Sequence, residues 1–185
     1  TVVLGATVPP EVAAQCSTSI TIDPERETSE AQRRINAPRP LTLNEVSSAS
    51  DTAYVKEIIK LVKAAWEPSA RIAVMVNTVR MAQEISSQLE KAKETTGHVR
   101  LVTSRMRSTD RPELESWESG VIVATQCLEV GVDISFDTLI TEACPYTSLV
   151  QRLGRLNRKA DSKNPTAVLV HSPSKDGEFG VRKAT

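Results

Sequence analysis

The stretch QRLGRLNR, which begins at Gln151, holds three arginines within eight residues. We expect it to be helical, which places Arg155 and Arg158 on one face, while Gly154 lets a backbone or a phosphate come close. Guanidinium is planar and always charged, so paired arginines suit a phosphate whose charge grows in a transition state. A solvated face is the alternative, but it would interleave acidic residues, and residues 143–160 contain none. The spacing therefore indicates an anion-binding face.

A second candidate follows the apolar run GVIVAT, in the stretch TQCLEVGVD. Thr125 could cap a short turn of helix that Gly131 ends in the left-handed conformation. Alternatively, the Thr125 hydroxyl and exposed amides hold a phosphate oxygen, and Asp133 accepts a hydrogen bond from a sugar hydroxyl. Local spacing does not separate these two interpretations.

Basic residues gather after another apolar run, in VRLVTSRMRSTDR. Four arginines against one nearby acid leave a local excess of three positive charges: Arg100, Arg105, Arg107 and Arg111. A solvated basic face remains the alternative, and Asp110 could cap a helix that begins at Pro112. In the stretch VNTV, Asn77 or Thr78 is a candidate helix N-cap, but the same helix start offers free amides to a phosphate.

The elements that position these residues follow from hydrophobic periodicity. Apolar runs and one alternating segment predict strands at 41–46, 71–77, 98–104, 120–125, 137–143 and 166–172. Helical spacing predicts helices at 54–65, 79–93 and 148–156, with a short one after Pro112. Strands that alternate with helices predict an α/β fold with a doubly wound, mainly parallel sheet and helices on both faces. In such sheets ligands bind at the carboxyl ends of the strands.

The first third of the chain is less regular. It begins with the apolar run TVVLGAT, a helix that opens at Pro9 and Pro10, and a short strand at 18–22. Residues 23–52 are rich in charge, Pro, Ser, Thr and Asn, so we expect a linker or loop that carries only the alternating strand.

Composition limits the function classes. With 23 basic and 23 acidic residues among 185, any nucleic-acid site must be local, and 3% aromatic content argues against base stacking. No apolar run approaches the roughly 20 residues of a membrane span, and the start lacks a signal peptide, so we expect a cytoplasmic protein. The three cysteines (Cys16, Cys127 and Cys144) share no C-x-x-C spacing, so we expect small buried residues, with neither disulfides nor a metal site.

Several of these stretches together resemble a known family. QRLGRLNR resembles motif VI of superfamily 2 helicases, and ATQCLEVGVD resembles motif V. LGATVP resembles motif III, which closes the first lobe, and NTV at Asn77 is similar to motif IV. TSRMRSTDR resembles the H-S-R-F-x-x-x-D-R stretch of the CRISPR-associated effector helicases of type I systems. The chain is thus identified as a second, C-terminal RecA-like lobe, most like that of the CRISPR family.

The resemblance implies a role for each matching position. Arg158 matches the arginine finger, Arg155 a second γ-phosphate contact, and Gln151 a residue that faces the attacking water or that phosphate. Gly131 and Asp133 match positions that line the nucleotide and its ribose. Six residues match positions near the nucleic-acid backbone: Asn77, Thr78, Ser104, Arg105, Arg111 and Thr125. Three residues match the motif that couples the lobes: Gly5, Ala6 and Thr7. The implied boundaries are 1–17 for the end of the first lobe, 18–175 for the second lobe and 176–185 for a tail.

The phosphate-binding loop and the acidic Walker B cluster of the first lobe are absent from this sequence. No G-x-x-x-x-G-K-[ST] loop precedes LGAT, so we expect half of a motor that is inactive alone, with ATP and Mg²⁺ bound mainly by the first lobe of the same protein. His98 and His171 are far apart, so we expect no nuclease site. The implied partners are that lobe, single-stranded DNA and a CRISPR surveillance complex, with no membrane. The alternatives are a lobe of another superfamily 2 DNA or RNA helicase, and a docking module without ATPase function.

Overall fold

The computed structural model describes residues 14, 24–47, 50–103, 114, 116–129 and 133–172. The chain divides into two compact units, Thr1–Asn36 and Ala37–Thr185. The implied lobe boundaries at 17/18 and 175/176 lie outside the described residues, as do the apolar run at the start, the strand at 18–22 and the short helix after Pro112.

The described part of the first unit contains the 3-10 turn η1 (Pro24–Arg26) and the helix α2 (Ser29–Ile35). The expectation of a linker over 23–52 was therefore wrong for α2. Thr28 caps this helix by accepting a hydrogen bond from the Ala31 N–H at 3.3 Å, and Arg34 pairs with Glu30 one turn earlier at 2.6 Å. No residue of α2 is buried, so local capping and this ion pair support the helix without an apolar face that the sequence could reveal.

The second unit is built on a six-stranded parallel sheet with the strand order β1-β6-β5-β2-β4-β3. Its strands are β1 (Leu41–Glu45), β2 (Arg71–Met75), β3 (Val99–Val102), β4 (Gly120–Ala124), β5 (Thr138–Glu142) and β6 (Thr166–His171). Each lies within a strand that the sequence predicted, because both faces of the central strands are buried and their apolar runs are nearly unbroken. This confirms the doubly wound, RecA-like α/β fold.

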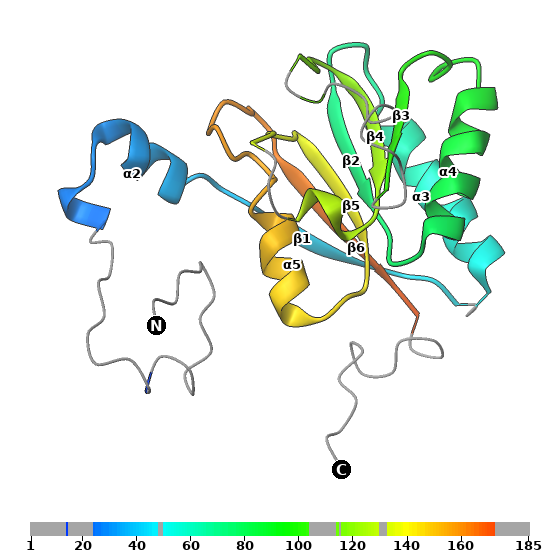
Figure 1. Cartoon of the computed structure of the whole chain (residues 1–185), viewed down its shortest axis with the longest axis horizontal. Helices are drawn as coiled ribbons and strands as arrows, with labels where there is room; N and C mark the ends of the chain where they lie inside the picture. Colours follow the sequence, from blue (N-terminus) through cyan, green and yellow to red (C-terminus); the bar gives the residue numbers. More distant parts are fainter. Residues whose placement is uncertain are drawn as a thin grey trace. The chain divides into compact units, whose positions relative to one another are not determined.

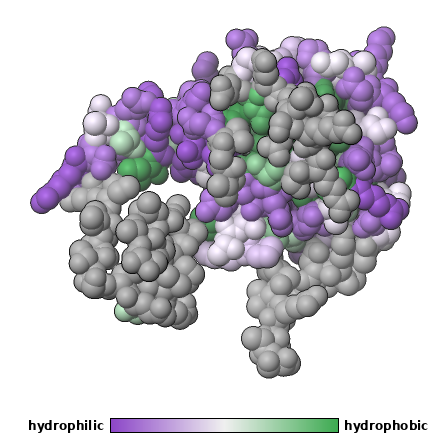
Figure 2. Space-filling model, in the orientation of Figure 1, coloured by the Kyte–Doolittle hydropathy of each residue, from purple (hydrophilic) through white to green (hydrophobic). Residues whose placement is uncertain are grey.

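Helices cover both faces of the sheet (Figure 1). On one face, α3 (Asp51–Ala65) and α4 (Val79–Lys91) pack on alternate residues of the strands, such as Ile72 and Val74 of β2. On the other face, α5 (Tyr146–Leu153) and the short turn η3 (Gln126–Leu128) lie over the remaining residues, such as Ala73 and Met75. Figure 2 shows a mainly hydrophilic surface on the side of the molecule where α4 lies, as the burial of the apolar side of this helix requires.

The helix α4 shows how local sequence places residues at the edge of the sheet. Four of its residues are buried on one side at helical spacing: Met81, Ala82, Ile85 and Leu89. Thr78 is its N-cap, because its hydroxyl accepts from the Met81 N–H at 3.2 Å. Of the two candidate caps, the structure thus selects Thr78, and α4 begins directly beyond the carboxyl end of β2.

The opposite edge of the sheet is fixed by Arg71, the first residue of β2. Its guanidinium bonds Asp137 at 2.7 Å and Asp161 at 2.9 Å. The two carboxylates raise the pKa of Arg71 above its ordinary value. This ion triad ties the start of β5 and the loop before β6 to the start of β2.

Candidate functional site

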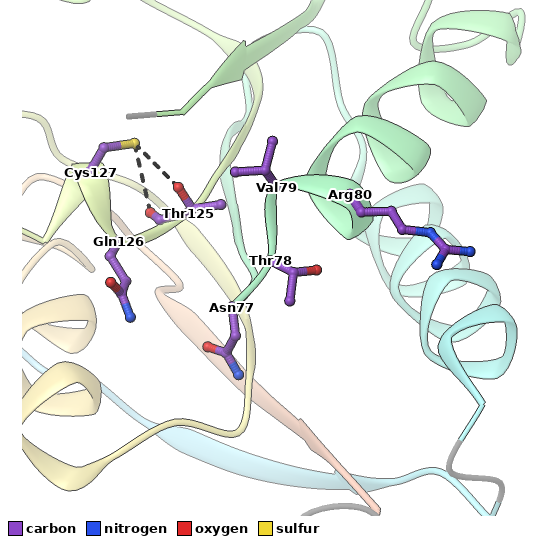
Figure 3. Close-up of a pocket in the computed structure, with 7 residues that line it drawn as sticks. All are labelled: Asn77, Thr78, Val79, Arg80, Thr125, Gln126 and Cys127. Carbon is purple, nitrogen blue, oxygen red and sulfur yellow. Dashed lines mark hydrogen bonds between the residues drawn. The ribbon is translucent and has the colours of Figure 1, made fainter. Parts of the chain in front are cut away.

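A hollow of about 700 Å³ opens where β2 and β4 end side by side. Figure 3 shows its lining residues: Asn77, Thr78, Val79, Arg80, Thr125, Gln126 and Cys127. They come from the segment that leads into α4 and from the turn η3. The hollow therefore brings together the NTV and ATQC stretches, which the sequence treated as separate candidates.

Arg80 lies at the edge of this hollow, and Figure 3 shows its side chain directed away from Thr125, Gln126 and Cys127. It is exposed in the first turn of α4, and no ion pair or hydrogen bond engages its guanidinium within the part of the chain that the structure describes. The sequence analysis overlooked Arg80, although its position two residues after the cap in NTVR could have indicated it. A free cation beside the unpaired amides of a helix start favours an anion.

Thr125 occupies the cap position of η3, but its hydroxyl makes no capping hydrogen bond. The side chain instead lies 3.9 Å from the Cys127 sulfur, whose thiol donates to the Val102 carbonyl at 3.1 Å. The capping interpretation of this hydroxyl was therefore wrong. The expectation of buried cysteines was wrong for Cys127 and Cys144, which are both half-buried. Cys127 lines the hollow, and Cys16 lies outside the described residues.

Asn77 is tied into the protein on three sides although it is exposed. Its N–H donates to Glu142 at 2.8 Å, its side-chain amide donates to the Ala143 carbonyl at 2.7 Å, and its Oδ1 accepts from Arg152 at 3.0 Å. The structure thus fixes the orientation of this amide at the rim of the hollow.

Arg152 is fully buried beneath that rim, with 0% of its side chain exposed. Its Nε donates to Glu129 at 2.9 Å, and one terminal nitrogen donates to the Thr141 hydroxyl at 2.8 Å. The carbonyls of Met75 and Glu142 lie at 3.4 and 3.3 Å from the same nitrogen. The first arginine of QRLGRLNR is therefore a structural centre. The sequence analysis assigned it no role. Its acceptors lie in or next to β2, β5 and η3, which are distant in sequence, so no local pattern could predict these hydrogen bonds.

The prediction that Arg155 and Arg158 share a helix face was wrong. The helix α5 ends at Leu153 with Gly154 as its C-cap, and Leu156 then pairs with Phe136 in an isolated bridge. Asn157 follows with a positive φ of 47°, which turns the chain again. Leu156 pairs with Phe136 instead of continuing the helix, so a loop carries both arginines.

Arg155 is buried, with 7% exposed, rather than pointing into an open cleft. One terminal nitrogen donates to the Glu129 carbonyl at 2.7 Å. Burial lowers the pKa of Arg155, and the nearby charge of Arg158 lowers it further. Glu129 therefore holds both arginines, Arg152 through its carboxylate and Arg155 through its backbone. The sequence analysis did not single out Glu129, although it lies inside the quoted motif.

Arg158 is the accessible arginine of the loop. Its side chain is 42% exposed, and its Nε donates to Asp133 at 2.7 Å, whose side chain is 71% exposed. Two residues that the sequence assigned to one nucleotide site thus lie in contact. Such exposed pairs contribute little to stability, so a stronger anion can replace the carboxylate. Gln151 lies in the last turn of α5 and is half-buried.

The remaining candidates lie outside the described residues: Gly5, Ala6, Thr7, Ser104, Arg105, Arg111 and Gly131. Among the described residues, no group of three His, Cys, Asp or Glu side chains could hold a metal ion. No described helix is long and apolar enough to cross a membrane.

Comparison with known proteins gives one family. Residues 68–161 match the family model described as CRISPR-associated nuclease/helicase Cas3, C-terminal. The CRISPR-associated endonuclease/helicase Cas3 of Escherichia coli is 32% identical over an alignment of 133 residues, which covers 65% of this chain and 14% of that protein. The chain thus spans about a seventh of the length of this relative.

Solved structures agree in fold. The crystal structure of T. fusca Cas3 with ADP has a TM-score of 0.52 at 24% identity, over 72% of this chain and 18% of that one. The C-terminal domain of the DEAD-box protein Dbp5 has a TM-score of 0.53 at 16% identity, over 74% and 77%. At these identities the likeness shows the fold alone, which is the α/β fold described above.

Proposed function

The chain belongs to the family of C-terminal domains of the CRISPR-associated nuclease/helicase Cas3, and we propose that it works as the second lobe of an ATP-dependent DNA helicase. In this proposal a first RecA-like lobe of the same protein binds ATP and Mg²⁺. The second lobe, which this chain forms, closes over the nucleotide. The chemistry that this chain supplies is the stabilisation of negative charge on the γ-phosphate.

The observation that carries the proposal is the accessible pair of Arg158 and Asp133 beside the buried Arg155. Arg155 is held by the Glu129 carbonyl and needs no reorganisation to keep its place. Arg158 donates to the exposed carboxylate of Asp133 at 2.7 Å and, at the longer distance of 3.5 Å, to the Gly154 carbonyl, and a phosphate oxygen can displace that carboxylate. An arginine that meets charge in the transition state contributes about 10³ to 10⁵ in rate. In this proposal the Asp133 carboxylate then accepts a hydrogen bond from the ribose.

The hollow at the ends of β2 and β4 is our proposed contact for single-stranded DNA. Thr78 and Thr125 offer hydroxyls there, and Arg80 offers a charge without a described partner. These groups recognise phosphate rather than bases, which suits a motor that must move over any sequence. Ser104, Arg105 and Arg111 extend this contact in the proposal.

Further parts of the proposal rest on the family. Gly131 lines the nucleotide, Gln151 faces the attacking water, and Gly5, Ala6 and Thr7 couple the lobes. A CRISPR surveillance complex delivers the DNA, and the protein works in the cytoplasm, where DNA and ATP are available.

The test compares the chain alone with the full-length protein that carries it. We expect DNA-stimulated ATP hydrolysis and strand separation by the full-length protein, and no turnover above background by the chain alone. A full-length protein that binds DNA without hydrolysing ATP would support a docking module. Robust hydrolysis by the isolated chain would contradict the assignment of a second lobe.

A further inference from the structure

The short segment 37–40, which precedes β1, lies along the loop that carries the arginines. We call residues 37–40 the amino-terminal strap. Its Pro38 carbonyl accepts from the Asn157 side chain at 3.3 Å, and its Pro40 carbonyl accepts from the Ala167 N–H at 3.0 Å. The strap is thus bonded both to the arginine loop and to β6.

Arg39 makes the most direct contact between the strap and the loop. Its Nε donates to the Leu156 carbonyl at 3.0 Å, and another nitrogen donates to the Ala37 carbonyl at 3.2 Å. Leu156 is fully buried and lies between the two arginines that the proposed function uses. One guanidinium therefore clamps the loop to the strap by two backbone carbonyls.

The opposite side of the loop is held by Phe136. The Phe136 N–H donates to the Arg155 carbonyl at 3.0 Å, and the Asn157 N–H donates to the Phe136 carbonyl at 2.8 Å. The Leu156 carbonyl takes no part in this bridge, and it accepts instead from Arg39. Loss of Arg39 would leave the bridge intact but release the loop on the side of the strap.

Arg39 also shares its surroundings with Arg158. Burial lowers the pKa of Arg39, and the charge of Arg158 lowers it further. Like charges repel each other, and Arg39 is fixed by the Leu156 and Ala37 carbonyls. The repulsion therefore adds to the attraction of Asp133 in setting the position of Arg158.

We propose that Arg39 is a positioning residue for Arg158: it fixes the Leu156 carbonyl and so sets where the accessible arginine meets the phosphate. This inference rests on the proposed function. It adds a residue outside every motif of the sequence analysis, three positions into the second unit. The chain that enters this unit is thereby tied to the arginine loop.

The test uses the full-length protein and steady-state ATP hydrolysis, well below its melting temperature. Arg39→Ala is expected to lower kcat by roughly 10- to 100-fold with KM for ATP within about twofold, because misplacement by about 1 Å can cost that much. Arg39→Lys, which keeps a charged donor, should recover part of kcat, and the neutral donor in Arg39→Gln should recover less. Lys63→Ala, which removes an exposed cation near the end of α3, on the face of the sheet opposite to the one on which Leu156 packs, is the control and should change neither constant.

A double-mutant cycle separates this inference from the proposed function. If Arg39 acts through Arg158, then Arg39→Ala should have little further effect on kcat in an Arg158→Ala background. Additive losses, or a raised KM with unchanged kcat, would overturn the positioning role, the latter in favour of direct contact with the nucleotide. An Arg158→Ala variant with full turnover would refute the proposed function itself. A loss of kcat with Arg39→Ala in that case would also overturn the positioning role.

Discussion

Arg152→Met removes the fully buried cation at the centre of the described lobe, and we expect a large loss of stability. Arg152 has the buried carboxylate of Glu129 as its ion-pair partner at 2.9 Å, and Met fills similar space without replacing the charge. Breaking a buried pair on one side costs about 3 to 5 kcal/mol, because the other charge stays buried and uncompensated. For a domain of this size that corresponds to a fall in melting temperature of roughly 6 to 20 °C.

Urea denaturation of the chain measures this loss, with Glu129→Gln in the same background as the decisive comparison. Neutralising Glu129 should recover part of the stability, whereas the acceptors at Thr141 and Asn77 remain without their donor. Recovery should therefore be incomplete, with about 1 to 3 kcal/mol still missing for the buried Thr141 hydroxyl, because Asn77 is exposed and can bond water instead. An Arg152→Met variant within about 1 kcal/mol of the original chain would refute the view that this arginine organises the site.

Three further predictions concern Arg155, Arg80 and the carboxylates at Arg71. Arg155→Ala should lower the free energy of unfolding by about 1 to 3 kcal/mol, measured by urea denaturation, because it leaves the Glu129 carbonyl without its donor; an unchanged midpoint would contradict its burial. Arg80→Ala should weaken the binding of single-stranded DNA equally for all sequences, and it should reduce the slope of log affinity against log salt concentration by about 1. Titration at several salt concentrations measures both effects. A loss of affinity that depends on the DNA sequence would argue against a phosphate contact. Burial raises the pKa of Asp137, but hydrogen bonds from Arg71 outweigh this effect and hold the pKa below the ordinary value of 3.8. Hydrogen bonds from Arg71 also lower the pKa of Asp161 below 3.8. A depressed pKa stabilises the fold above the unfolded value, so this contribution should be lost as the pH falls below about 4, and Arg71→Met should flatten that part of the stability curve; an unaltered curve would count against the triad.

The sheet was predictable because its determinants are local. The central strands β2 and β4 are apolar along their whole length, and α4 repeats its buried residues at helical spacing behind a threonine cap. Each of these signals lies within a dozen residues of sequence. The helix α2 escaped prediction because it buries nothing, so only its cap and one ion pair mark it.

The sequence singled out Arg158 and Asp133, which the structure places in contact, but it did not predict the loop that carries Arg158. Their role at a nucleotide stays a prediction. The end of α5 before Arg155 depends on Phe136, which lies 20 positions away from its bridge partner Leu156. The clamp by Arg39 joins residues 117 positions apart. Helical periodicity carries no information about such long-range pairings.

The central claim, that Arg158 faces the phosphate of ATP, is tested most directly by ATP turnover of the full-length protein with Arg158→Ala. We predict a fall in kcat of about 10³ to 10⁵ with ATP affinity within a few fold, and little rescue by Arg158→Lys, because a point charge does not reproduce the planar fork. The melting temperature of the lobe should hardly change, since the pair with Asp133 is exposed. The contradicting result has two parts: the full-length protein with Arg158→Ala retains its ATP turnover, and the same substitution unfolds the isolated lobe. Together they would show that Arg158 is structural.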